Sequence, residues 1–414
     1  MEYLTPSFTK DMLDDYTILI PCMCPIQFSC IKPAMESEGY HIEMLTNSGE
    51  QVASLGLRYV HNDTCYPALL VIGQFLDALN SGRYDVHHTA LLISQSGGGC
   101  RASNYIRLLR KALVKAGYGF VPVASINASG LEKGSTMPMS IRMLRKVVAA
   151  AEYGDEIAAL RNQITPYENV KGAGDAWAAK WISTVSDWFH ANRNYSFHAM
   201  KKKFFDIADD AALVPVTRVP KVKVGVVGEI YVKFSPLGNN DLQAFLEKEG
   251  CEVNMPGLMG YIEYCAANLK LDTKFYGMSA MTGRIAGLAL SILDNTGIAM
   301  NKAMKAAGFY APGSFAELMK KPEGILNLGV KMGEGWLLTG EMVELIEGGY
   351  ANIVCAQPFG CLPNHICGKG VSNKIRSMYP EANITAVDYD PSATRVNQEN
   401  RIKLMLAVAR EKLK

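Results

Sequence analysis

Several cysteines of this chain lie in short loops whose composition suits ligand binding. The richest loop reads Cys355-Ala-Gln-Pro-Phe-Gly-Cys361-Leu-Pro-Asn-His-Ile-Cys367, and two others read Asn-Asp-Thr-Cys65-Tyr-Pro and Ser-Gly-Gly-Gly-Cys100-Arg. Cysteines that serve only as small buried hydrophobes do not favour such positions. Cysteines that converge on an iron–sulfur cluster do, and this is the chemistry that the loops indicate.

Three glycines precede Cys100 at the start of an expected helix. They could form a plain turn, cradle a phosphate at the helix N-terminus, or let backbone approach a bulky anionic cluster. No Lys-Ser or Lys-Thr pair follows them, so the string is not a P-loop. The third reading suits the adjacent cysteine best, and it makes Gly98 and Gly99 candidate cofactor-binding residues.

The spacing Cys355-x5-Cys361-x5-Cys367 fits neither a zinc ribbon nor a ferredoxin run. These cysteines could therefore meet other ligands only through the fold. In the same loop, His365 is a candidate ligand or proton donor, or it makes a structural hydrogen bond. Glu229 follows an expected strand, where its carboxylate could relay protons or cap a neighbouring backbone.

The first third of the chain has the alternation of strand and helix that positions such loops. Apolar, β-branched runs predict strands at 16–21, 41–45, 89–94 and 120–126, and helical spacing predicts helices at 26–38, 66–79 and 102–116. This rhythm is typical of a parallel sheet covered by helices. Ligands bind beyond the carboxyl ends of such strands, where we expect Cys65, Cys100 and Cys355, the last at the end of a strand over 352–355.

The rest of the chain predicts a helical stretch and then a second α/β unit. Residues 139–208 show little strand pattern, two prolines break the chain at 214–220, and further strands are expected at 223–227, 352–355 and 384–387. The predicted fold is α/β, with two Rossmann-like parallel-sheet domains and an intervening helical segment. The expected boundaries are 1–135, 136–215 and 216–414.

Composition narrows the classes of function. The 414 residues carry a net charge of +2, which gives no nucleic-acid signal. No stretch of eighteen uncharged apolar residues predicts a membrane span, and the N-terminus lacks a signal-peptide core. Ten cysteines without such a signal indicate a reducing compartment, so we expect a cytoplasmic protein. Cys251, which stands alone before a strand-like segment, is expected to be a buried hydrophobe.

Four strings together resemble the 2-hydroxyacyl-CoA dehydratase superfamily, and in particular its double-cubane cluster proteins, related to the C-terminal part of CoA-enzyme activase-like chains. The strings are Tyr-Val-His-Asn-Asp-Thr-Cys65-Tyr-Pro-Ala, Gly-Gly-Gly-Cys100-Arg-Ala-Ser-Asn-Tyr, Val-Val-Gly-Glu229-Ile and Cys355-Ala-Gln-Pro-Phe-Gly-Cys361-Leu-Pro-Asn-His. The resemblance spans almost the whole chain.

The resemblance implies two 4Fe–4S cubanes joined by a sulfide, an 8Fe–9S unit held by six cysteines. It also implies a homodimer, and a separate ATP-hydrolysing activase that carries its own 4Fe–4S cluster and delivers electrons. Because this chain has no P-loop, the nucleotide should bind that partner. The implied ligands are Cys65, Cys100, Cys355 and Cys361, completed by Cys265 and Cys24, with Cys22, Cys30 and Cys367 as rivals.

Three functions are consistent with these features. The first is an iron–sulfur oxidoreductase that takes low-potential electrons from the ATP-dependent partner and reduces a small molecule. The second is a 2-hydroxyacyl-CoA dehydratase-type component with a 4Fe–4S cluster. The third is a non-catalytic scaffold that stores electrons. We expect neither a nucleic-acid partner nor a membrane.

Overall fold

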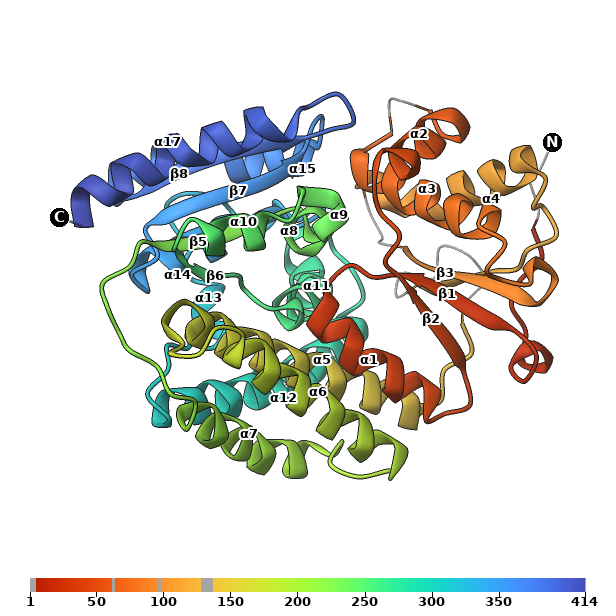
Figure 1. Ribbon diagram of the computed structural model, residues 1–414, viewed down its shortest axis with the longest axis horizontal. Helices are drawn as coiled ribbons and strands as arrows, with labels where there is room; N and C mark the ends of the chain where they lie inside the picture. Colours follow the sequence, from red (N-terminus) through yellow and green to blue (C-terminus); the bar gives the residue numbers. More distant parts are fainter. Residues whose placement is uncertain (1–4, 62–63, 96–98, 128–136, 414) are drawn as a thin grey trace.

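A computed structural model describes residues 5–61, 64–95, 99–127 and 137–413. These residues form two four-stranded parallel sheets with helices packed on both faces of each (Figure 1). The predicted two-sheet α/β organisation is thereby confirmed. Across the described ranges, every helix is too short or too polar to cross a lipid bilayer.

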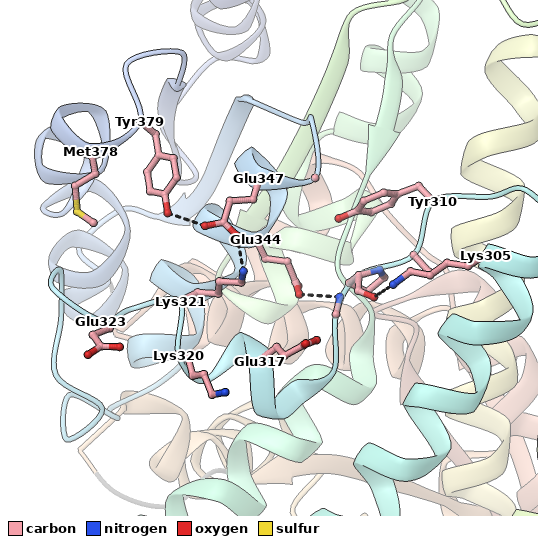
Figure 2. A pocket seen from close by; sticks show the side chains of 14 residues that line it. Lys305, Tyr310, Glu317, Lys320, Lys321, Glu323, Glu344, Glu347, Met378 and Tyr379 are labelled. Carbon is pink, nitrogen blue, oxygen red and sulfur yellow. Dashed lines mark hydrogen bonds and ion pairs between the residues drawn. The ribbon is translucent and has the colours of Figure 1, made fainter.

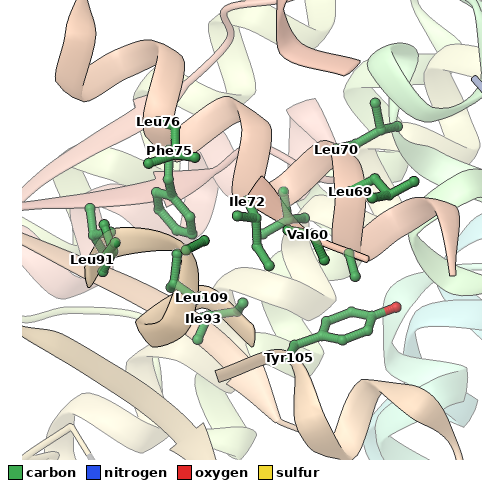
Figure 3. Close-up of a cluster of buried hydrophobic side chains, with 14 of the residues drawn as sticks. Val60, Leu69, Leu70, Ile72, Phe75, Leu76, Leu91, Ile93, Tyr105 and Leu109 are labelled. Carbon is green, nitrogen blue, oxygen red and sulfur yellow. The ribbon is translucent and has the colours of Figure 1, made fainter. Parts of the chain in front are cut away.

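The first sheet has the strand order β2-β1-β3-β4. Its strands are β1 (Thr17–Pro21), β2 (His41–Leu45), β3 (Thr89–Gln95) and β4 (Val123–Asn127). One face is covered by α2 (Glu50–Tyr59), α3 (Tyr66–Asn80) and α4 (Tyr105–Ala116), and the other by α1 (Pro25–Glu36). Figure 3 shows the apolar core between β3, α3 and α4.

Helix α2 was not predicted from the sequence. Gly56 lies within it, and glycine lowers the propensity for helix. The structure explains the glycine, because a Cβ there would lie 2.2 Å from the carbonyl oxygen of Leu69 on α3. Close packing of two helices thus overrides the local preference.

A helical layer connects the two sheets. It consists of α5 (Ile141–Ile164), α6 (Ala173–His190) and α7 (Phe197–Ala212). These helices share one apolar core with α1 and with the C-terminal part of α12 (Ala280–Ala306). Helices from all three predicted segments therefore meet here, at the bottom of Figure 1.

The second sheet repeats the order of the first, as β6-β5-β7-β8. Its strands are β5 (Lys223–Gly228), β6 (Glu252–Asn254), β7 (Asn352–Pro358) and β8 (Asn383–Tyr389). Helices α10 (Leu242–Lys248) and α17 (Arg395–Leu413) cover one face, and α14 (Gly335–Glu347) and α16 (Ser372–Met378) cover the other. The remaining helices are α8 (Ile230–Phe234), α9 (Pro236–Asn239), α11 (Leu258–Phe275), α13 (Phe315–Leu318) and α15 (Leu362–Asn364).

One strand boundary differs from the prediction in a way that matters for the site. We expected β7 to end at Cys355, but it pairs with β8 as far as Pro358, opposite Tyr389. Cys355 is therefore the fourth of seven strand residues and lies inside the sheet. Cys361, three residues beyond the strand, is the cysteine that lies past the carboxyl end of β7.

Candidate functional site

Both sheets place chemically active residues at the same two loops. In each, the first strand lies between the second and the third, so the loops after the first and third strands diverge at the carboxyl edge, where ligands bind in folds of this kind. Cys22 directly follows β1, and Glu229 directly follows β5. Cys100 follows β3 and Cys361 follows β7. The repeated topology thus brings sulfur and carboxylate groups to equivalent positions.

Four cysteines immediately precede helical segments. Cys24 precedes α1, Cys65 precedes α3, Cys100 precedes a 3-10 turn that leads into α4, and Cys361 precedes α15. Burial raises the pKa of Cys65 and of Cys361, while the N–H groups of Ala68 and Asn364, three residues further on, lower it. Such N–H groups stabilise a thiolate or a cluster sulfide.

A pair of carboxyl groups, those of the half-buried Glu229 and the buried Glu334, lies near these thiols. Glu229 caps α8 by accepting a 2.8 Å hydrogen bond from the N–H of Val232. Glu334 accepts one from the N–H of Ile230 at 3.0 Å and one from the Asn364 amide at 3.2 Å. Burial, followed by the charge of Glu334, raises the pKa of Glu229, so the pair favours retention of a proton.

Three thiols, those of Cys65, Cys100 and Cys361, lie within electrostatic range of Tyr105 or Glu229. Burial raises the pKa of Cys65. The Tyr105 hydroxyl, which lies 2.6 Å from the Cys65 sulfur, lowers it, and the Glu229 carboxylate raises it. Glu229 likewise raises the pKa of Cys361. Burial raises the pKa of Tyr105, and Cys65, Glu229 and Cys100 raise it further. Figure 3 shows the Tyr105 ring in the core with its hydroxyl at the margin.

The loop before α14 joins the two halves of the molecule at this point. Gly333 has a φ of +59°, and a Cβ there would lie 3.0 Å from Pro363 Cγ and 3.9 Å from the Cys100 sulfur. The neighbouring Met332 sulfur accepts a 3.1 Å hydrogen bond from the N–H of Gly99. The loops that carry Cys100 and Cys361 are thus brought together by a glycine that leaves room for both.

The other three predicted ligands lie elsewhere. Cys355 is fully buried in the apolar cluster under α14, and its sulfur would lie 2.8 Å from a Cβ on Gly368. Cys24 is buried against α5 and α11. Cys265 is exposed on α11.

The structure also shows where the alternative cysteine ligands lie. Cys22 is half-buried after β1. Burial raises the pKa of Tyr231, and Glu229, Tyr66 and Cys22 raise it further. Cys30 lies in the core of the helical layer and Cys367 in the cluster of α14. Cys251 is a buried hydrophobe in the second sheet's core, as its sequence context predicted.

The remaining predicted residues have structural partners or lie outside the description. Glu229 makes the backbone cap that was one of its two expected roles. His365 Nδ1 lies 3.3 Å from the Gln357 amide, and its Nε2 lies 4.0 Å from Asp388. Gly98 lies outside the described residues, whereas Gly99 is described.

Some residues of the site were not singled out in the sequence. Tyr105 and Asn364 stand within the motif strings, and their side chains contact the Cys65 and Cys361 sulfurs, the latter at 3.4 Å. Glu334 stands between two glycines far from any cysteine in the chain. The two flanking glycines indicate that other backbone packs closely here, but no local pattern predicts which groups the Glu334 carboxylate contacts.

A cavity of about 550 Å³ lies among residues other than those of this site (Figure 2). It lies where α14 ends and where the chain enters β7 and β8, at the amino ends of the strands. Several of its polar groups bond to one another, since Lys321 and Tyr379 both bond to Glu347 and Gly313 donates to Glu344. In a parallel sheet this is the edge opposite to the usual ligand site.

In the ranges that the structure describes, no three His, Cys, Asp or Glu side chains are already arranged to hold a metal ion. Metal binding would therefore require the gathered thiols to close further, with loss of their protons. No protein-family model, curated protein or solved structure matches the chain.

Proposed function

We propose that this chain is an iron–sulfur oxidoreductase that takes low-potential electrons from a separate ATP-hydrolysing partner and reduces a small molecule. One observation carries the proposal. The loop of Gly333 and Glu334 brings Cys100 of the first α/β unit close to the loop of Cys361 in the second, and the Glu229 carboxyl group is near enough to Cys65 and Cys361 to raise the pKa of both beyond the effect of burial. The resemblance of the surrounding motifs to double-cubane cluster proteins adds support.

The donor set fits iron–sulfur chemistry. Thiolates before helix starts, with backbone N–H groups directed at the sulfurs, are typical of cluster binding. Three thiols are gathered, which suits one 4Fe–4S cubane with one iron left for another ligand. An 8Fe–9S double cubane would need three more. Cys265 and Cys22 are at least partly exposed and could supply two of them, whereas Cys24 and Cys355 would have to leave apolar cores.

An iron–sulfur cluster, when bound, would supply electrons one at a time for the reduction. The chain's own residues hold it and manage protons: Asn364 donates to the Cys361 sulfur and to Glu334, and it thereby fixes their separation. Glu229 places a carboxyl group that retains a proton next to the thiols. Because Glu229 is anchored by the N–H of Val232, it would act as a proton donor from a fixed position.

A second candidate is a dehydratase-type component with a single 4Fe–4S cluster. The count of three gathered thiols favours it, because such a cluster uses three cysteines and leaves one iron open to substrate. The two candidates differ in iron content. A non-catalytic electron store would bind the cluster but would not turn over a substrate.

Anaerobic purification with iron and sulfide analysis tests the proposal. We expect about eight irons per chain for the double cubane and about four for the single cubane. Absence of iron after anaerobic reconstitution would refute the cluster. Turnover of small unsaturated compounds with reductant, ATP and the partner would then separate a reductase from an electron store.

Single substitutions identify the ligands. Cys65→Ala, Cys100→Ala and Cys361→Ala should each lower the iron content and change the cluster spectrum. Cys251→Ala is the matched control, because Cys251 is buried far from the site in the core of the second sheet. Iron content and spectrum unchanged in Cys361→Ala would remove that residue from the ligand set.

A further inference from the structure

Two glutamates of α14 face the same neighbouring helix. Glu334 immediately precedes α14 and already has helical backbone angles, and Glu341 follows it by seven residues. Seven residues make almost two full turns, so the two side chains leave the helix on the same side, about 10 Å apart along its axis. Both meet α8. Glu334 accepts the N–H of Ile230 at 3.0 Å, and Glu341 forms a 3.2 Å ion pair with Lys233.

Helix α8 arranges its own two charged groups in the same way. Glu229 caps the helix, and the N–H of Lys233 donates to the Glu229 carbonyl oxygen at 2.6 Å. Residues four apart in a helix lie on one side of it. Each of the two helices therefore carries one carboxyl group near the thiols and one charged group further along the same side.

A small cavity is lined by both Glu334 and the ion pair of Lys233 with Glu341. About 10 Å³ of it is open to the centre of a water molecule, and Tyr261 also lines it. One water needs about this volume and two to four polar partners. The lining supplies two carboxyl groups, an ammonium group and a phenol. The cavity therefore suits one water that bridges Glu334 to the ion pair.

The charges around this cavity do not balance. Among the described residues that line it, Lys233 is the only cation. Beside Glu334 and Glu341, a third carboxyl group lies just behind the wall, since a Cβ on Gly257 would come within 2.4 Å of Asp155 Oδ2. Burial raises the pKa of all three carboxyl groups. A buried set with one ammonium group and three carboxyl groups favours retention of additional protons.

We propose that Lys233, Glu341 and the bridging water form a proton store that recharges Glu334 during the reduction. This inference rests on the proposed reductase function and adds the source of its second proton. Reduction of one double bond consumes two electrons, which the ATP-hydrolysing partner supplies, and two protons. The pair of Glu229 and Glu334 holds one proton, and Lys233 holds the other.

The second proton moves in two transfers. Once the substrate has taken the first proton, Glu334 is a carboxylate. The Lys233 ammonium group then gives a proton to the water, and the water gives one of its own protons to Glu334. An N–H bond and a water O–H bond break, while a water O–H bond and a carboxyl O–H bond form. Lys233 is left neutral beside Glu341 and regains its proton from solvent between turnovers.

Proton exchange of the carboxyl pair tests the store without iron. After transfer of the full chain to D₂O, infrared spectroscopy follows the C=O band of the protonated pair, which is identified by its loss in Glu334→Gln. Exchange should be about a hundredfold slower in Lys233→Arg, because arginine keeps the charge beside Glu341 but cannot release a proton. Lys233→Met with Glu341→Met should slow exchange equally. An unchanged rate in either folded variant would overturn the proposal, as would an empty cavity in a high-resolution crystal structure.

The matched control removes a buried ion pair from another part of the molecule. Lys146 is fully buried with its Nζ 2.7 Å from Glu38, and neither residue lines the cavity. Lys146→Met with Glu38→Met should leave the exchange rate unchanged. Equal slowing in this control would assign the effect to the loss of any buried ion pair and would overturn the proposal. Circular dichroism checks that each variant is folded.

Turnover separates the proton store from the proposed function. Both Lys233 variants should keep the wild-type iron content and turn over about a hundredfold more slowly. Absence of iron or of turnover in the wild-type chain would refute the proposed function alone, because the exchange rates do not depend on either. Turnover of Lys233→Arg at the wild-type rate would refute the proton store alone.

Discussion

Gly228 is the residue whose replacement should disturb the site most through the backbone alone. It ends β5 with a φ of +153° and pairs with Ala356 on β7. A Cβ there would lie 1.9 Å from the Ala356 carbonyl oxygen, 2.8 Å from its carbonyl carbon and 3.0 Å from its nitrogen. All three atoms belong to the backbone of a central strand, so no side-chain rotation could relieve the overlap.

The expected cost of Gly228→Ala follows from this geometry. To accommodate the methyl group, β5 and β7 would have to separate where the N–H of Glu229 donates to the Ala356 oxygen at 3.1 Å. We expect a loss of about 4 kcal/mol in the free energy of unfolding, at the upper end for single substitutions. Because Glu229 would shift with β5, iron content should fall as well.

Urea denaturation of Gly228→Ala and Gly250→Ala provides the assay. Gly250 also has a positive φ, +81°, but a Cβ there would meet nothing within 4 Å. Gly250→Ala should therefore cost only about 1–2 kcal/mol, the usual cost of a left-handed conformation. Equal losses in the two variants would show that the contact with Ala356 is unimportant and would refute the reasoning.

The remaining predictions concern buried charges. Lys233 and Glu341 form a 3.2 Å ion pair at about 5% exposure, so Lys233→Met should cost about 3–5 kcal/mol in urea denaturation, whereas Lys233→Met with Glu341→Met should recover most of it. Persistent instability of the double variant would contradict this. Glu156 is fully buried, and neither oxygen has a hydrogen-bond partner in the described structure; burial, then Glu152, raises its pKa well above the usual value. Because the folded pKa exceeds the unfolded one, stability should fall as pH rises above about 4.5, by at most about 1.4 kcal/mol per unit. Glu156→Gln should make the free energy of unfolding less dependent on pH between pH 5 and 8. An unchanged slope would show that other groups cause the pH dependence.

Local sequence was a sound guide to features that depend on neighbouring residues. The strand at 41–45 and the start of α3 directly after Cys65 were predicted correctly, because β-branched runs and helical spacing are local signals. The loop positions of Cys100 and Cys361 followed from the same patterns. The helical nature of the middle segment was predicted for this reason too.

Features that depend on distant pairing were not predictable in this way. Whether β7 stops at Cys355 or continues to Pro358 is decided by the length of β8, some thirty residues away in the chain. The pairing of Glu229 with Glu334 depends on the fold of α14 and its preceding loop. No pattern around either glutamate encodes that contact.

The sequence by itself determined which residues could do chemistry and that most of them stand at the ends of strands or the starts of helices. Those are properties of short segments, governed by periodicity and by glycine and proline. Only the tertiary structure decided that Cys65, Cys100 and Cys361 gather while Cys355 and Cys24 are buried in apolar cores. The reason is geometric, since a sulfur's neighbours are set by strand order and helix packing across hundreds of residues.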